Sequence, residues 1–411
     1  MKEKLFNEYS SSKVGIQETQ IVSFDKVNKE THSFRVHKDG FVGIHYQQGK
    51  MTDEEGFAKA EKNLELKRPY EFELEEGVRH RNLQKKEYSD KEVMDFAKKG
   101  LSYLKKTYPQ FVFDGAFVQN INFSSMKNEK GLDYSTKDSH IFVDISFKHV
   151  DSKEMCDGYF SFSLRKFSIK KFKDMADAYL QNFEKTVELP DEIIIYDKYY
   201  GYTSLLRNCL DAESLKKGTS LLSGKIGQKL FADDFTVTHD TSDKNAWMGD
   251  FWDGDGVVNK GDKVTLIKNG KLLRGYADKK TAKKYRVKNT GGANENYLDI
   301  PSNGNCSMTI KPTNKTAKEL LNGRLAIIPV LASGGGFKEK GEYTMPIHTG
   351  LLTDGEKILG RVPPFTIKSN MFDMFGKDLI GISKYQPLPP LNDKGILIKM
   401  EELVLRFFHR L

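Results

Sequence analysis

The sequence predicts an α+β fold in two domains, an N-terminal domain at residues 1–189 and a C-terminal domain at residues 190–411. The length of 411 residues is enough for two hydrophobic cores. Strand-like segments follow one another through Asp-Gly and Asn-Gly turns, which favours antiparallel sheet. Helical segments are set apart from the strands and do not alternate with them, as they would in parallel βαβ units. We place the boundary at Pro190, between a helix expected over 172–188 and the apolar strand "EIIIYD".

The N-terminal domain is predicted to be α/β with antiparallel strands. "GIQETQIVSFDKV" and "HSFRVHKDGFVGIHY" alternate apolar and polar residues, and Asp39-Gly40 forms the turn inside the second segment. "HIFVDISF" and "GYFSFSL" are also strand-like. Helices are expected to begin at the capping sequences "TDEE", from Thr52, and "SDKE", from Ser89, and Pro109 ends the second helix.

The C-terminal domain is predicted to be a mostly antiparallel, barrel-like β domain with short helices. "KVTLIKNGKLLRGY" reads as a hairpin with Asn269-Gly270 at its turn, and "GLLTDGEKILG" as another around Asp354-Gly355. "TAKE", from Thr316, is a capping sequence for one short helix.

Composition limits the compartment and the partners. Hydrophobic residues make up 38% and charged residues 30%, which is typical of a globular protein. No run approaches the roughly 18 apolar residues of a membrane span, and the first residues lack the apolar core of a signal peptide, so we expect a cytoplasmic protein. The net charge of +8 comes from lysines spread along the chain, so nucleic acid is not the expected partner.

Several catalytic signatures are missing. There is no G-x-S-x-G sequence, and "GFKEKGEY" carries Glu342 where a phosphate-binding loop needs lysine. Cys156, Cys209 and Cys306 are spaced too widely for a disulfide framework or a metal knuckle. "GDFWDGDG" lacks the later ligands of a calcium loop, so we interpret it as an acidic turn.

The nine histidines do not form a recognisable metal site. No HExxH sequence occurs, and His32 and His37 lie on opposite faces of one strand. His239 has Asp233 on its own face of an expected strand and Asp240 beside it, but we favour a hydrogen-bonded histidine. Catalytic zinc takes three protein ligands, and three cannot be assembled. We therefore predict no catalytic residue and no metal site in this chain.

The segment "NTGGANENYLDIPSNGN", residues 289–305, is predicted to be a long loop because Gly, Asn and Ser favour turns. Loops of this length inside a domain are functional or disordered.

The chain resembles the TldD/PmbA family, also known as modulators of DNA gyrase. The likeness covers most of the chain and is looser in the N-terminal half. It rests on the order in which short matching segments, called blocks here, follow one another. In order these are Lys217-Gly218-Thr219-Ser220, Gly224 and Gly227, Asp253-x-Asp255-Gly256, the "IKNGKLLRGY" hairpin, Thr281-Ala282 and Thr290-Gly291. "GGGFKEKGEYTMPIHTGLLTDGEKI" and "IKSNMFDMFGKDLIGI" resemble later blocks of the family.

The resemblance implies a cytoplasmic zinc metalloprotease system of two related subunits, TldD and TldE (or PmbA), that acts on unfolded peptides. The TldD-type subunit is expected to carry zinc on an HExxxH helix just before the Lys-Gly-Thr-Ser block, and a C-terminal cysteine. Here no histidine lies between Tyr202 and Lys217, and Arg207 and Asn208 stand where a ligand and the general base are sought. After Ile380 the chain reads "GISKYQPLPPLNDK", without cysteine.

These departures favour a non-catalytic TldE/PmbA-like subunit, without a cofactor of its own, whose TldD-like partner holds the zinc. The alternatives are a homodimer that binds peptides or another protein, a regulator of gyrase or DNA, and a metalloprotease with ligands moved to His239, Asp233 and Asp234. By the same resemblance, a cleft for the unfolded peptide is expected at a set of four loop residues, and the alternative that its glycines only form a structural turn stays open. The set is Thr290, Gly291, Gly292 and Asn294.

Overall fold

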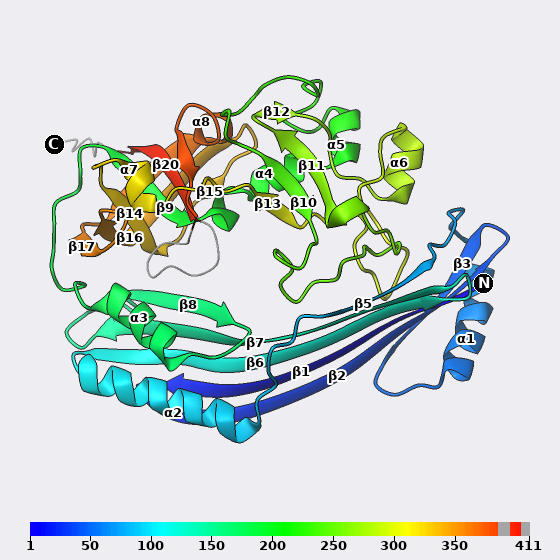
Figure 1. Ribbon diagram of the computed structural model, residues 1–411, viewed down its shortest axis with the longest axis horizontal. Coiled ribbons are helices and arrows are strands. Elements are labelled where there is room, and N and C mark those ends of the chain that lie inside the picture. Colours follow the sequence, from blue (N-terminus) through cyan, green and yellow to red (C-terminus); the bar gives the residue numbers. More distant parts are fainter. Residues whose placement is uncertain (385–394, 404–411) are drawn as a thin grey trace, which may run out of the picture.

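The computed structural model describes residues 1–384 and 395–403, and it has the expected α+β architecture in two domains. A long, curved sheet forms one layer, and a β-rich C-terminal part lies over one face of it (Figure 1). Among the described residues, no helix is both long enough and apolar enough to cross a membrane.

The N-terminal sheet owes its length to four antiparallel strands of 16 to 19 residues. Its strand order is β4-β3-β2-β1-β6-β7-β5, and β8 pairs with β7. The strands are β1 Lys2–Gln17, β2 Gln20–Lys38, β3 Phe41–Gln48, β4 Arg68–Pro69, β5 Gly77–Asn82, β6 Phe111–Asn128, β7 Leu132–His149 and β8 Gly158–Leu164.

Three helices accompany this sheet: α1 Asp53–Lys62, α2 Asp90–Thr107 and α3 Ile169–Leu180. The capping box at the start of α2 is closed, because Ser89 Oγ accepts from Glu92 N at 3.3 Å and Glu92 Oε2 accepts from Ser89 N at 2.8 Å. The helix expected to continue to residue 188 ends at Leu180 instead. Beyond it, Val187 N donates to Arg361 O, so residues 186 and 187 pair with a distant segment of the chain and do not continue the helix.

A five-stranded barrel forms the centre of the C-terminal part. β14, β9, β20, β18 and β16 pair in this order, and β14 also pairs with β16, which closes the ring. The strands are β9 Ile193–Lys198, β14 Ala326–Ala332, β16 Glu342–Thr353, β18 Phe365–Asn370 and β20 Gly395–Glu402, with β15 Gly336–Phe337, β17 Ile358–Val362 and β19 Leu379–Ile382 at its margins.

A smaller sheet, β12-β11-β10-β13, and five short helices complete the C-terminal part. Its strands are β10 Val237–Asp240, β11 Lys263–Lys268, β12 Lys271–Leu272 and β13 Met308–Ile310. The helices are α4 Ser204–Cys209, α5 Ala212–Lys217, α6 Lys279–Tyr285, α7 Ala317–Leu321 and α8 Met371–Met374, and 3₁₀ turns cover Asn63–Leu66, Tyr199–Tyr202 and Lys260–Asp262.

The predicted Asx-Gly turns are confirmed. Asn269 and Gly270 have φ of +50° and +74°, and a Cβ on Gly270 would lie 2.1 Å from the Phe231 carbonyl oxygen. Only glycine fits this position. The turn between β1 and β2 was missed, because Glu18 and Thr19 adopt positive φ without a glycine to signal it.

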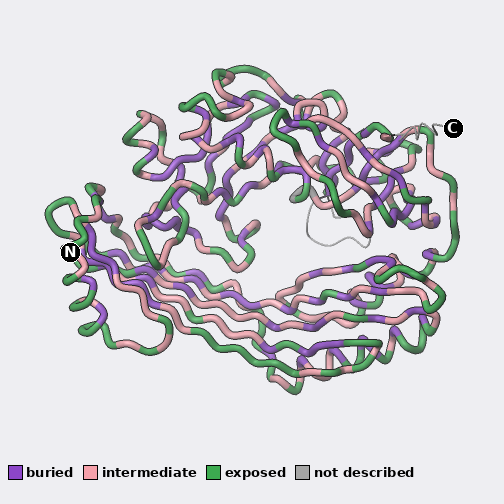
Figure 2. The backbone as a smooth tube through the Cα atoms, turned by 180° about the vertical axis from the view of Figure 1, so that it is seen from behind, coloured by how far each residue is buried: buried purple, intermediate pink, exposed green. Residues whose placement is uncertain are grey.

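Both parts contribute to a shared hydrophobic core. Phe147 and Phe172 from the sheet side belong to the same buried cluster as Ile194, Ile328 and Leu397 from the barrel. A second cluster fills the barrel and continues to the smaller sheet. Figure 2 shows buried residues along the strands of both layers. Pro190 lies in the connection between α3 and β9, and the boundary at this residue stays a prediction.

Substituting Ser89→Ala should lower the free energy of unfolding by about 1 kcal/mol, because α2 loses the capping oxygen at its first turn. Urea unfolding followed by circular dichroism measures the change. Ser102→Ala, at an exposed site within the same helix, is the control and should be neutral or slightly stabilising. An equal loss in both variants would contradict the capping account.

Candidate functional site

A cavity of about 360 Å³ lies between the N-terminal sheet and two loops of the C-terminal part. One loop covers residues 241–262 and the other is the Asn/Gly-rich segment 289–305. The cavity is lined by Asn7, Asn122, Ser124, Met248, Gly249, Asp250, Trp252, Glu295, Tyr297, Asn305 and Ser307.

The sheet side of the cavity is a polar surface. Asn7 Nδ2 donates to Asn122 Oδ1 at 2.8 Å, and the Ser124 hydroxyl accepts from Asn122 Nδ2 at 2.9 Å. These residues come from neighbouring positions on β1 and β6, where Asn7 pairs with Ser124 in the register. The surface therefore offers amide and hydroxyl groups to whatever enters the cavity.

The loop side carries two carboxyl groups that hydrogen-bond to each other, Asp250 and Glu295. Burial raises the pKa of Glu295 well above its ordinary value, and the negative charge of Asp250 raises it further. Burial also raises the pKa of Asp250. Glu295 is still exposed where it borders the cavity. Two carboxylates this close do not both ionise readily, so the pair keeps a proton to a higher pH than an isolated carboxyl group would.

The acidic turn predicted in "GDFWDGDG" is confirmed, and it joins the two loops. Asp253 accepts backbone hydrogen bonds from Asp255 N, Val257 N and Ala293 N at 3.0, 2.9 and 3.0 Å. Burial and the charge of Asp255 nevertheless raise the pKa of Asp253 to about 8. Tyr70 OH donates to Asp255 Oδ1 at 2.9 Å, which ties the turn to the N-terminal part.

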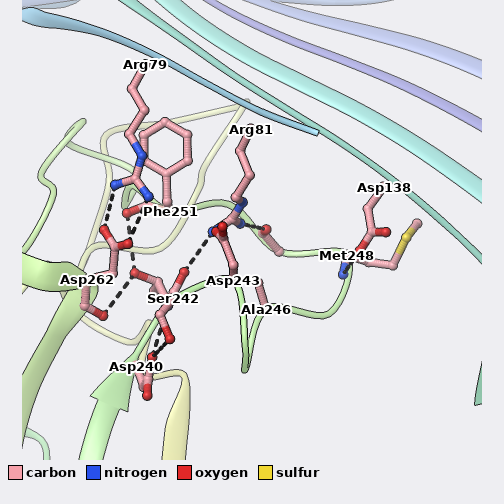
Figure 3. A network of polar contacts seen from close by, with 12 residues as sticks. Arg79, Arg81, Asp138, Asp240, Ser242, Asp243, Ala246, Met248, Phe251 and Asp262 are labelled. Carbon is pink, nitrogen blue, oxygen red and sulfur yellow. Dashed lines mark hydrogen bonds and ion pairs between the residues drawn. The ribbon is translucent and has the colours of Figure 1, made fainter. Parts of the chain in front are cut away.

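Two arginines on β5 hold the first loop against the sheet (Figure 3). Arg79 makes two hydrogen bonds to Asp262, at 2.6 and 2.8 Å, and its guanidinium lies 4.1 Å from the centre of the Phe251 ring. Arg81 donates to the carbonyl oxygens of Thr241 and Gly249. Gly249 lines the cavity, so these contacts fix its rim.

A third arginine, Arg35 on β2, reaches the second loop. It is 1% exposed and donates to Glu3 Oε2 at 3.1 Å, to Gly254 O at 3.3 Å and to Asn296 O at 2.8 Å. Asn296 follows Glu295 directly, so this contact positions the carboxyl pair. Our sequence reasoning missed all three arginines, although the i, i+2 spacing of Arg79 and Arg81 on a strand places both on one face.

The four loop residues predicted to bind peptide are not among the residues that line the cavity. Thr290 is fully buried, and its hydroxyl accepts from Ala277 N at 2.7 Å. Gly291 has φ of +67°, and a Cβ on Gly292 would lie 2.7 Å from Asn303 Oδ1. Asn294 N donates to Ser302 O at 2.8 Å. The contacts of these four residues stabilise the loop, and other residues of the same loop line the cavity. The role of the four residues in peptide binding stays a prediction.

Arg207 and Asn208, the region of the degenerate metal motif, lie on α4 before the Lys217–Ser220 block. Arg207 is half-buried beside Cys306, and Asn208 is exposed. Burial raises the pKa of Cys306 to about 12 and also raises that of Cys209. The Arg207 guanidinium and the Asn208 amide are not among the thiolate, neutral imidazole and carboxylate ligands that zinc takes. The zinc implied by the resemblance therefore does not fit here.

His239 is a buried, hydrogen-bonded histidine, as we interpreted it. Its Nδ1 accepts from Ser307 N at 2.9 Å, and burial lowers its pKa. Asp233 is not on its strand, because β10 begins at Val237, and it forms an exposed ion pair with Lys229. In residues 1–384 and 395–403, no three His, Cys, Asp or Glu side chains gather in a way that could hold a metal ion. The segment after Ile380, where a TldD-type subunit would carry its cysteine and this chain has none, falls largely outside the described residues.

The carboxyl pair should make the free energy of unfolding decrease as the pH rises. A folded-state pKa of Glu295 above its ordinary 4.5 means that the native chain keeps a proton that the unfolded chain releases. The free energy of unfolding should therefore decrease as the pH rises from the ordinary pKa of 4.5 through the raised pKa of the folded chain. Glu295→Gln, which can still donate to Asp250, should make this decrease shallower in urea titrations. Glu339→Gln, at an exposed site, should keep the wild-type slope; identical slopes in all three proteins would contradict the shared proton.

Comparisons with known proteins agree with the resemblance. The family model described as "PmbA/TldA metallopeptidase C-terminal domain" matches residues 201–390. An uncharacterized protein of Methanocaldococcus jannaschii is 24% identical over 408 residues, which cover 92% of this chain and 93% of that protein.

Solved structures share the fold over nearly the whole length. TldE from Thermococcus kodakarensis has a TM-score of 0.79 at 18% identity, covering 98% of this chain and 96% of that one. A candidate modulator of a DNA gyrase from Thermotoga maritima has a TM-score of 0.76 at 18% identity, with 98% and 95% covered. Residues 201–390 therefore match the PmbA/TldA metallopeptidase C-terminal domain, and nearly the whole chain shares the fold of these structures, in agreement with the predicted resemblance to the TldD/PmbA family.

Proposed function

We propose that this chain is a non-catalytic TldE/PmbA-like subunit of a cytoplasmic, TldD/TldE-type zinc metalloprotease that acts on unfolded peptides. The observation that carries the proposal is the chemistry of α4. Where the family motif would supply zinc ligands and a general base, the chain presents the Arg207 guanidinium and the Asn208 amide. Neither group accepts a proton from water or donates an electron pair to zinc at neutral pH.

The cavity gives such a subunit a physical role. Its amide and hydroxyl surface on β1 and β6 can hydrogen-bond the backbone of an extended peptide, and the carboxyl pair lies opposite. The partner would supply metal and base, and this chain would supply part of the wall that encloses the substrate. The likeness to a protein named TldE supports this division of work.

Zinc content is the first test. The chain purified alone and dialysed without chelator should contain well under one zinc per chain by elemental analysis, because its α4 donor set repels or cannot bind the metal. Stoichiometric zinc would contradict the proposal and point to relocated ligands. In that case His239→Ala and Cys209→Ala would show whether these residues hold it.

Assembly is the second test. Co-expression with a TldD-like chain from the same genome should give a stable complex that cleaves an unstructured fluorogenic peptide, whereas this chain alone should not cleave it. Arg207→Leu should leave the activity of the complex unchanged, because Arg207 has no catalytic role in the proposal. Failure to co-purify, combined with a stable dimer of this chain in light scattering, would favour the stand-alone homodimer.

A further inference from the structure

Within residues 1–384 and 395–403, no strand pairs with the outer edge of β2 from Gln20 to Glu30. β1 pairs with residues 20–36 of β2, but β3 pairs only with residues 31–38. The Glu30 carbonyl accepts from Gly49 N at 2.8 Å, so its backbone groups point away from β1. Alternate residues of an antiparallel strand share this direction, which leaves the N–H and C=O of Phe24, Lys26 and Asn28 facing the open edge.

This edge also exposes apolar side chains. Val22, Phe24 and Val27 are 59%, 39% and 40% exposed, and Figure 2 shows the rim of the sheet as a largely exposed strand. Native proteins usually block such edges with proline, bulges or a covering segment, because free backbone groups and apolar side chains together attract another strand. No proline interrupts residues 20–30, and the register shift in the β1–β2 pairing lies near the start of this stretch, opposite Gly15 and Ile16, so it leaves residues 24–30 regular.

A basic groove continues from the start of this edge along α2. It has a volume of about 670 Å³ and is lined by Gln20, Ile21, Lys98, Leu101, Ser102, Lys105 and Lys106. Within the described residues, no carboxylate lies in ion-pair distance of its three lysines, whereas Lys26 nearby is paired with Asp90 at 2.9 Å. Ile21 and Leu101 give the groove an apolar floor between the positive charges.

We infer that the β2 edge and the basic groove bind an extended acidic segment of another protein by strand addition. The open backbone groups would pair with the segment, and its carboxylates would meet Lys98, Lys105 and Lys106. A second copy of this chain fits less well. Its own β2 edge carries Asp25 and Glu30 alongside Lys26 and Lys29, so it brings no net negative charge to the three lysines. The inference does not depend on the proposed subunit role.

The charge component is tested with a fluorescein-labelled peptide of about ten residues that alternates glutamate and valine, a length that matches a typical long strand. Fluorescence anisotropy with the full chain should show binding. The triple variant Lys98→Glu, Lys105→Glu, Lys106→Glu should bind about tenfold more weakly or less, and added salt should weaken wild-type binding. Lys288→Glu, Lys311→Glu, Lys338→Glu changes the net charge equally at other exposed sites and should bind as wild type.

The strand component is tested without altering the protein. N-methylation of two adjacent central residues of the peptide removes backbone donors on both of its edges and should abolish binding. Asn28→Pro should weaken binding of the unmodified peptide, and Asn28→Ala, which keeps the N–H, should not. No binding of the unmodified peptide, or equal binding of the methylated one, overturns the inference. A dimer in light scattering that Asn28→Pro dissociates would assign the edge to a second copy and also overturn it.

Discussion

A buried charge must be paired and its donors satisfied, and two buried arginines of the N-terminal sheet, Arg35 and Arg81, meet part of this requirement by binding loops of the C-terminal part. Arg35 is almost fully enclosed, and its donors reach Glu3, Gly254 O and Asn296 O. Removing either side of such a contact leaves charge or carbonyl groups buried without partners, a cost of about 3–5 kcal/mol for a buried ion pair. The relative position of sheet and loops is therefore strongly determined, and with it the shape of the cavity between them.

The same enclosure explains the acid chemistry of the site. His37 and Arg35 outweigh burial at Glu3 and hold its pKa below the ordinary value, because positive charge is close. At Glu295 burial dominates, and the nearest titratable group is another carboxyl. Glu3 and Glu295 thus have opposite pKa shifts. Positive charge lowers the pKa of Glu3, whereas burial and the carboxyl group of Asp250 raise the pKa of Glu295.

Local sequence patterns predicted much of the fold and little of the site. The Ser89 capping box, the Asn269-Gly270 turn and the β8 strand depend on residues near in sequence, and their prediction succeeded. Beyond the end of α3, residues 186 and 187 pair with Arg361, far along the chain, and no local pattern could reveal this contact. Asp250 stood out in an acidic segment, but its partner Glu295 lies 45 residues later in a loop, so their pairing required the tertiary structure. The open edge of β2 likewise follows from the short reach of β3, which periodicity does not show.

Changing the chemistry of α4 and losing the cavity would cost the chain different amounts of stability. Losing zinc ligands requires only a few side-chain changes on a short helix whose core contacts, through Leu206 and Cys209, stay in place. Losing the cavity would require separating Arg35 and Arg81 from their loops, which would leave buried donors without partners. A family member can therefore lose metal chemistry at small cost to stability while the enclosed, polar space is retained. Under the proposed function, this chain would shape the substrate cavity and its partner would carry the reaction.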